Sequence, residues 1–277
     1  MSKVLGLVIS ARRLGNSEIM LKEIMGSIPE PCEKELIRMT DLNLKNCNAC
    51  YKCLEHDGSC VLKDDYNFIM AKIHEADALL IGVPVYLLGP HGNYKVLSDR
   101  MVANLLHTPY TKGKPCAVVV PFGTAGWEGY TRTAALVMPH LLQMKLVDYW
   151  PVLATLPGES IINPANLEYA HNLGRRLMSV EGMKPSERSC PACGADLFRL
   201  LPDNMVECPI CGIKGELKSG NIPYFSSLEE SRFSEHHMAE HFGVWVKEMK
   251  QKFHADKDLL REIQKPYREI DWWVKPE

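Results

Sequence analysis

Five short segments of strand pattern alternate with segments of helical pattern, and this alternation constrains the fold more than any other feature. The strand segments are 4–9, 34–39, 78–83, 117–120 and 147–153, and those at 4–9, 78–83 and 117–120 are apolar runs. Helical patterns follow near 18–25, 65–75, through 99–101, and at 131–143 and 166–178. Fully apolar strands joined by helices are typical of a parallel sheet that is covered on both faces. The sequence therefore predicts a doubly wound α/β fold with a five-stranded parallel sheet.

Three polar loops, at 10–17, 84–93 and 122–130, each follow an apolar segment. In a doubly wound sheet, ligands bind outside the carboxyl ends of the strands. The first loop offers hydroxyl groups, a guanidinium and the N-terminus of a helix to a phosphate, through Ser10, Arg12, Asn16 and Ser17. Ser17 also fits the N-cap of that helix with no ligand at all, and both interpretations remain open.

The second feature is a C-x2-C-x2-C-x6-C run formed by Cys47, Cys50, Cys53 and Cys60. Such a run can wrap its thiolates around one inorganic cluster, whereas it closes tetrahedral zinc geometry only with strain. We interpret the four residues as ligands of a [4Fe-4S] cluster. A zinc knuckle, disulfides or unliganded cysteines are the alternatives. Disulfides are disfavoured because such close neighbours strain the S–S geometry.

A second cysteine set consists of two CPxCG knuckles separated by fourteen residues: Cys190 with Cys193, and Cys208 with Cys211. Each knuckle turns tightly enough for two sulfurs to share one ion, and its glycine permits the turn. The pattern resembles a zinc ribbon and favours structural zinc. A rubredoxin-type iron centre is the alternative, because its knuckles look alike.

Composition limits the partners and the compartment. The 277 residues carry a net charge of −2, which gives no reason to expect nucleic acid or an anionic membrane as the main partner. We find no signal-peptide pattern and no apolar run of roughly 18 residues. Eight of the ten cysteines fall in the two sets with ligand spacing, as is typical of a reducing compartment. We therefore expect a soluble, cytoplasmic protein with divisions at 1–183, 184–220 and 221–277.

The first 180 residues resemble the iron-sulfur flavoproteins of the flavodoxin-like NADPH-dependent FMN reductase superfamily. The resemblance rests on SARRLGNS at 10–17, the cysteine run followed by LKDD, GVPVYLLGP at 82–90 followed by KVLSDR, and a glycine-containing loop after the fourth strand. It implies a flavodoxin-like fold, non-covalent FMN, a cluster on the loop after the second strand, and assembly into homodimers or homotetramers.

The resemblance also implies roles for particular residues. The FMN phosphate would be held by Ser10, Arg12, Asn16 and Ser17. The isoalloxazine would lie along Pro84, Val85, Tyr86 and Leu87, and would be flanked by Gly123, Thr124 and Gly126. His91 and Tyr86 are candidate proton donors, since the unperturbed pKa of histidine lies near working pH. A loop histidine that is solvated or bonded to backbone is the alternative for His91.

The tail after residue 220 carries two further patterns. His237 and His241 are four residues apart on one helical face and could chelate a metal, but without an apparent third ligand a polar helix face is the favoured interpretation. Tyr267, Trp272, Trp273 and Val274 present enough apolar surface that we expect them to pack on the core or on another subunit.

A flavin beside a cluster predicts a redox protein that converts two-electron into one-electron chemistry. The electron donor would be ferredoxin or NAD(P)H, and the acceptor a small molecule such as a quinone, an oxygen species or an organic substrate. No G-x-G-x-x-G follows a strand, so NAD(P)H would have to stack on the flavin. The alternatives are an NAD(P)H-dependent FMN or quinone reductase, a non-catalytic electron carrier, and a redox sensor.

Overall fold

A sheet of five parallel strands forms the centre of the computed structural model, which describes residues 1–179, 181–218, 222–225 and 227–268. The strands are β1 (Ser2–Val8), β2 (Cys32–Arg38), β3 (Ala78–Gly82), β6 (Pro115–Phe122) and β7 (Lys145–Leu153). Their order is β2-β1-β3-β6-β7, and every neighbouring pair is parallel. The predicted doubly wound, flavodoxin-like sheet is thereby confirmed.

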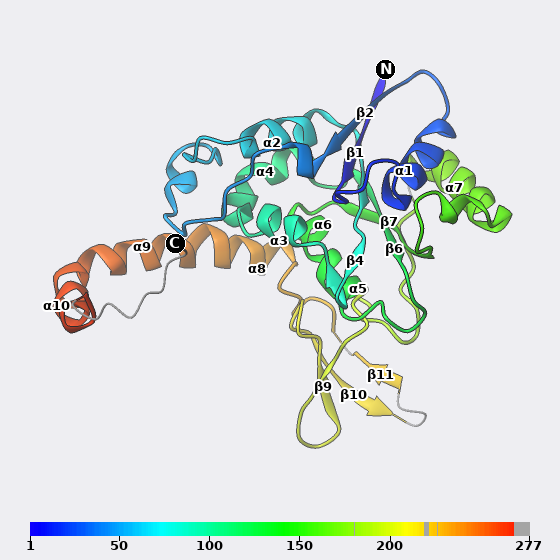
Figure 1. Cartoon of the computed structure of the whole chain (residues 1–277). Coiled ribbons are helices and arrows are strands. Elements are labelled where there is room, and N and C mark those ends of the chain that lie inside the picture. The colour runs from blue at the N-terminus through cyan, green and yellow to red at the C-terminus, as the bar shows by residue number, and fades with distance from the viewer. Residues whose placement is uncertain (180, 219–221, 226, 269–277) are drawn as a thin grey trace.

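Helices cover both faces of the sheet (Figure 1). One face carries α1 (Asn16–Gly26) and α7 (Pro164–Arg176). The other face carries α2 (Tyr66–Glu75), α3 (Gly92–Ser98), α4 (Asn104–Thr111), α5 (Thr131–Ala135) and α6 (Val137–Leu141). Along β1, Leu5 and Leu7 pack in one core while Val4 and Val8 pack in the other. Burial on both faces explains why β1, β3 and β6 read as apolar runs, whereas the edge strand β2 carries charged side chains.

Two predicted helices differ in extent from the prediction. The pattern at 131–143 forms two short helices, because Pro139 has no N–H to donate to the carbonyl of Ala135. The hydroxyl of Tyr94 donates to that carbonyl instead, at 2.5 Å. The helix expected to run through residue 101 ends at Ser98 and is followed by a 3-10 turn at Met101–Ala103.

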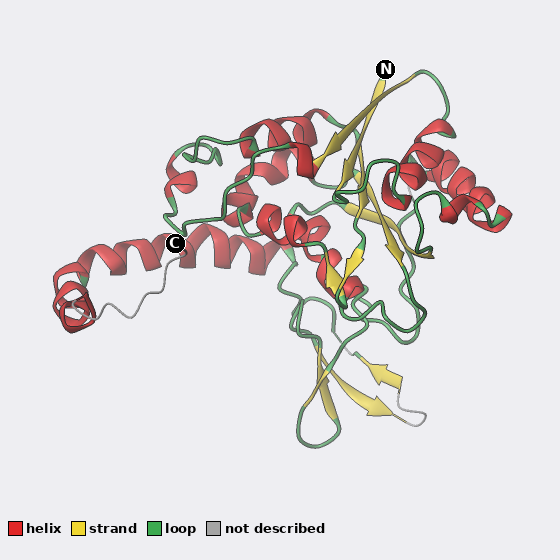
Figure 2. Ribbon diagram, in the orientation of Figure 1, coloured by secondary structure: helices red, strands yellow, loops and turns green. Residues whose placement is uncertain are grey.

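The cysteine knuckles belong to a separate antiparallel sheet of order β11-β10-β9-β8, which lies below the core in Figure 2. Its strands are β8 (Arg199–Leu200), β9 (Met205–Glu207), β10 (Lys214–Lys218) and β11 (Ile222–Tyr224). The first knuckle is tied to the core: Arg132 Nε donates to the Gly194 carbonyl at 2.8 Å, and His140 Nε2 lies 2.8 Å from the Cys193 carbonyl. These contacts hold the ribbon against α5 and α6.

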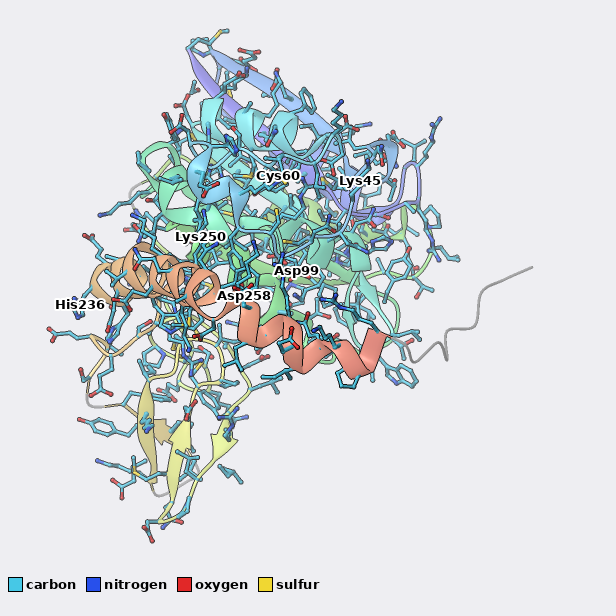
Figure 3. The ribbon with its side chains drawn as sticks, turned by 90° about the vertical axis from the view of Figure 1, so that its left-hand side faces the viewer. Lys45, Cys60, Asp99, His236, Lys250 and Asp258 are labelled. Carbon is cyan, nitrogen blue, oxygen red and sulfur yellow. The ribbon has the colours of Figure 1, made fainter. Side chains whose placement is uncertain are left out.

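The tail comprises α8 (Glu235–Met238), a π-helical turn (Ala239–Trp245), α9 (Val246–Ala255) and α10 (Lys257–Arg268). Lys250 of α9 pairs with Glu55, so this helix contacts the loop that holds the first cysteine run. Figure 3, in which Lys250 and Cys60 are labelled, shows the tail helices crossing this side of the core. Trp272, Trp273, Val274 and the side chain of Tyr267 lie outside the described residues. None of the described helices combines the length and apolarity needed to cross a membrane.

Candidate functional site

A cleft of about 320 Å³ opens at the carboxyl ends of β1, β3, β6 and β7. It brings together nine of the residues that the sequence indicated: Ser10, Arg12, Asn16, Ser17, Pro84, Val85, Tyr86, Leu87 and Gly123. Thr124 and Gly126 belong to the same loop as Gly123 but are not among the lining residues. The cleft lies where strand order reverses between β1 and β3, the position at which flavodoxin-like sheets bind their ligands.

Ser17 lies at the base of this cleft and has an unpaired hydroxyl. The residue is 2% exposed, and its Oγ has no hydrogen-bond partner within the described part of the chain. The N-cap of α1 is Gly15, so Ser17 does not cap the helix. The first intrahelical bond runs from Ile19 N to Gly15 O at 3.0 Å, which leaves the amides of residues 16–18 ahead of it. A buried hydroxyl beside free helix N-terminal amides fits a phosphate group.

The side chain of Asn16 forms hydrogen bonds within the protein, unlike the unpaired hydroxyl of Ser17 next to it. Its Nδ2 donates to the carbonyls of Ala154 and Leu156 at 3.1 and 3.0 Å, and its Oδ1 accepts from Ser160 N at 3.3 Å. The side chain therefore ties the loop after β7 to the start of α1. Only the backbone amide of Asn16 is left for a ligand.

Glu18 places a negative charge in the first turn of α1, next to the proposed anion site. Burial opposes ionisation, but hydrogen bonds from Lys22, Leu14 N and Arg38 outweigh it and lower the pKa of Glu18 to about 2. The two cations lie 2.7 and 2.6 Å from the carboxylate and offset its charge. The N-terminus of α1 therefore remains suitable for an anion.

A short hairpin forms one lip of the cleft. It pairs β4 (Val85–Tyr86) with β5 (Gly89–Pro90), and its two-residue turn holds Leu87 and Leu88 at positive φ, with Leu87 95% exposed. Turns of this type favour glycine and asparagine, so the Leu-Leu sequence gave no signal for a hairpin. The Leu88 carbonyl accepts the Tyr130 amide at 2.9 Å, which joins the hairpin to the loop after β6.

His91 lies behind the hairpin and is not among the residues lining the cleft. Its Nδ1 accepts the Asn93 amide at 3.2 Å, so His91 caps α3. Its ring packs edge-on against Tyr86, with ring centroids 4.8 Å apart. Burial lowers the pKa of His91, which favours a neutral ring with its proton on Nε2. Tyr86 is the candidate proton donor that faces the cleft.

The first cysteine run lines one small pocket together with Arg100. The Ala49 amide lies 3.4 Å from Cys47 Sγ, in the arrangement of an N–H···S hydrogen bond. Burial and the neighbouring thiols raise the pKa of Cys53, so four thiolates gathered here need a positively charged group between them. The pocket fits a metal cluster held by these cysteines.

Hydrogen bonds at its two ends fix the shape of the cysteine loop. Asp64 Oδ2 accepts the Lys45 amide at 2.8 Å, and Asp65 Oδ2 accepts the Asn43 amide at 2.7 Å. The side chain of Asn67 bonds both the amide and the carbonyl of Cys60, at 2.8 and 2.9 Å. The LKDD segment thus closes the loop that carries the cysteines.

The ribbon cysteines form a tighter and fully buried site. Cys190 Sγ lies 3.4 Å from Cys211 Sγ, and Cys193 Sγ lies 3.5 Å from Cys208 Sγ. Among the residues that the structure describes, only these four bring three or more ligand atoms within 4.8 Å of one another. A tetrahedral ion with metal–sulfur bonds of about 2.3 Å requires sulfurs roughly 3.8 Å apart. The ribbon therefore fits one ion, and the wider first run fits a larger group.

The tail histidines do not join a metal-ligand group of this kind. His237 Nδ1 lies 2.9 Å from Ser234 Oγ, and the His241 ring stacks on Trp245.

Sequence reasoning missed two buried groups near the cysteine loop. Arg100 pairs with Asp64, and His107 packs against Gly58 with its Nε2 unpaired in the described chain. The sequence offered no signal for either contact beyond the LKDD and KVLSDR segments.

A sheet of this order with a polar cleft at its switch point is the architecture of flavodoxin-like flavoproteins. Residues 2–154 match the family model of NADPH-dependent FMN reductases, and the chain belongs to this family. Family membership makes it a flavin-dependent oxidoreductase with FMN as its cofactor.

Individual relatives add detail. An iron-sulfur flavoprotein of Methanocaldococcus jannaschii is 29% identical over 189 residues, covering 64% of this chain and 96% of the relative. A flavone synthase of Aspergillus candidus is 26% identical over 204 residues, covering 62% of this chain and 63% of the relative. The solved structure of a flavone reductase gives a TM-score of 0.78 at 19% identity, covering 99% of this chain and all of the other. The last comparison extends the shared fold through the ribbon and the tail.

Proposed function

We propose that this chain is an iron-sulfur flavoprotein that exchanges electrons between FMN in the cleft and a [4Fe-4S] cluster on Cys47, Cys50, Cys53 and Cys60. FMN supplies two-electron transfer, and a cluster of this type supplies single-electron transfer. The main support for this proposal is the pocket that the four cysteines line. A backbone amide is directed at Cys47 Sγ, and the four sulfurs are not gathered as closely as the ligands of a single metal ion would be. The iron-sulfur flavoprotein relative supports the same assignment.

In this proposal the chain binds FMN through the base and lips of the cleft. Ser17 Oγ and the amides of residues 16–18 bind the phosphate, together with Ser10 and Arg12. Residues 84–87 and the loop 123–126 border the ring. Tyr86, supported from behind by His91, supplies a proton to a substrate. Ferredoxin or NAD(P)H donates the electrons, and a small molecule accepts them.

We further propose structural zinc in the ribbon, with iron as the alternative. All four sulfurs are buried, and the ribbon is tied to α5 and α6, as suits a fold extension. The divisions at 1–183, 184–220 and 221–277 follow from this assignment. Exposed apolar side chains on two loops that follow strands, Leu87 after β3 and Trp127 after β6, support assembly into a homodimer or homotetramer.

A second candidate is redox chemistry on a flat aromatic compound of the flavone type, in which a double bond conjugated to a carbonyl is formed or, in the reverse direction, reduced. It is favoured by the flavone synthase relative and by the exposed Tyr86 and Leu87, which offer an apolar platform at the cleft. Anaerobic turnover of a flavone should then exceed turnover of a simple quinone, and Tyr86→Phe should lower the flavone rate at unchanged FMN content. Equal loss of both activities would count against a flavone-specific role of Tyr86.

The decisive experiment measures iron, acid-labile sulfide, zinc and flavin in anaerobically purified protein. We expect about four irons with matching sulfide, one FMN and one zinc per chain. Cys53→Ala should lose iron and sulfide but keep FMN and zinc. Cys32→Ala is the matched control, because Cys32 is a single buried cysteine in β2 and should change none of the four contents. Protein with FMN and zinc but no iron or sulfide would refute the cluster and leave a plain flavin reductase.

A further inference from the structure

Arg100 is a buried cation in the wall of the cysteine pocket. The residue is 3% exposed and lines the pocket together with the four cysteines, whereas its partner Asp64 does not line it. The guanidinium also lies over the ring of Tyr66, with Cζ 4.2 Å from the ring centroid. The positive end of a buried ion pair therefore faces the space that the cysteine sulfurs surround.

Asp64 accepts hydrogen bonds from the Arg100 guanidinium and from two backbone amides. One oxygen accepts from Arg100 Nη1 and from the Lys45 amide at 2.8 Å. The other accepts from Arg100 Nη2 at 3.0 Å and from the Tyr66 amide at 3.2 Å. Asp64 therefore binds the Nη1/Nη2 edge of the guanidinium. Each of its two oxygens already accepts two hydrogen bonds, so neither can accept another from the cysteines.

Arg100 itself has donors to spare. A guanidinium has five N–H groups. Nη1 donates to Asp64 and also to the Lys45 carbonyl, which lies 3.3 Å away. One N–H of Nη2 donates to Asp64. Nε is buried and has no partner among the described residues. Nε and the second hydrogen of Nη2 form one planar edge with two parallel donors. Arg100 and Cys60 line the same pocket, and the side chain of Asn67 holds the backbone of Cys60 in place there.

We propose that Arg100 sets the reduction potential of the cluster by donating this Nε/Nη2 edge to the cysteine sulfurs that line the pocket with it, and by placing its fixed charge beside the cluster. This inference rests on the proposed function, since it requires a cluster on the first cysteine run. Reduction adds one electron to the cluster and takes up no proton at Arg100, because a guanidinium stays protonated. A buried cation and hydrogen bonds to a ligand sulfur both favour the reduced, more negative cluster.

The test is an EPR-monitored redox titration of the full-length holoprotein. Arg100→Gln should lower the equilibrium constant for one-electron reduction of the cluster about tenfold, because a hydrogen bond to a charged group contributes about that much. A tenfold change corresponds to a reduction potential lower by about 59 mV for one electron. Arg100→Lys keeps the charge but loses the planar edge, so its potential should lie between those of Arg100→Gln and the wild type. Arg176→Gln is the matched control, because Arg176 pairs with Asp148 of β7, at the sheet edge opposite β2. The potential of this variant should equal that of the wild type.

Arg100→Gln leaves Asp64 buried without its partner, so the double variant Asp64→Asn/Arg100→Gln keeps the test valid by removing both charges. Its potential should also fall. Equal potentials in the wild type and the double variant, with cluster present in both, would overturn this inference alone. A wild-type protein that takes up no iron and sulfide would overturn the proposed function and this inference together.

Discussion

The buried hydroxyl of Ser17 leads to a prediction that separates ligand binding from folding. Ser17 Oγ is buried and makes no hydrogen bond within the described chain, so contacts within the protein give it no favourable partner. Ser17→Ala removes a buried polar group without a partner. We expect the free energy of unfolding of the apoprotein to stay constant or to rise by about 1 kcal/mol.

The same change should weaken FMN binding. A hydrogen bond from a hydroxyl to a phosphate oxygen is charge-assisted and contributes roughly 1.5–3 kcal/mol, so the Kd for FMN should rise about 10- to 100-fold. Flavin fluorescence during titration of the apoprotein measures the Kd, and urea unfolding of the same sample measures stability.

Ser160→Ala supplies a matched control. Ser160 also has a buried, unpaired hydroxyl in the described chain, but it does not line the cleft. The control should match the stability change of Ser17→Ala and leave the Kd for FMN unchanged. Unchanged FMN affinity in Ser17→Ala, or an equal loss of affinity in Ser160→Ala, would refute the assignment of Ser17 to the phosphate.

Three further predictions follow from the described contacts. Asn16→Ala should lower the unfolding free energy by about 2–3 kcal/mol in urea titrations, because three hydrogen bonds to the loop after β7 are lost. Burial, and then the neighbouring His74, lower the pKa of His107 from 6.5 to about 4. As pH drops, the histidine is protonated in the unfolded chain before it is protonated in the folded protein. The free energy of unfolding should therefore fall by roughly 3 kcal/mol at most between pH 6.5 and pH 4. His107→Gln should make the free energy of unfolding depend less on pH in this range. Cys193→Ser should abolish zinc binding by elemental analysis and leave FMN content intact, whereas loss of both would show that the ribbon is needed for the cleft.

Much of the core could be predicted because its determinants are local. The strand pattern predicted all five strands, and polar loops after three of them predicted the cleft. The CPxCG spacing predicted the two knuckles, because each is set by its own backbone turn. The 3.4 and 3.5 Å sulfur pairs join one knuckle to the other and depend on the folding of the ribbon. These features depend on residues close in sequence, where the period of apolar side chains and the need for glycine are visible.

The rest depends on contacts between distant residues. Asp64 and Arg100 are 36 positions apart, and only the packing of the loop before α2 against the turn after α3 joins them. Asn16 reaches residues about 140 positions further along, which no local pattern indicates. The contact of Lys250 with Glu55 likewise appears only once the tail is folded onto the core. Tertiary packing assigned these polar side chains roles that their sequence neighbours did not suggest.

Strained backbone gathers at the two proposed cofactor sites, and this bears on how the sites are formed. Nine non-glycine residues in the described chain have positive φ, and six of them lie in three loops: Leu14 in the phosphate loop, Ala49, Tyr51 and Asp57 in the cysteine loop, and Leu87 and Leu88 in the hairpin. Such conformations cost of order 1–3 kcal/mol each and persist only where surrounding contacts impose them. Here those contacts are made by the protein itself: Glu18 binds the Leu14 amide, Asn67 clamps Cys60, and Tyr130 binds the Leu88 carbonyl. Contacts within the chain thus hold parts of these three loops, which would lower the conformational cost of binding FMN and a cluster.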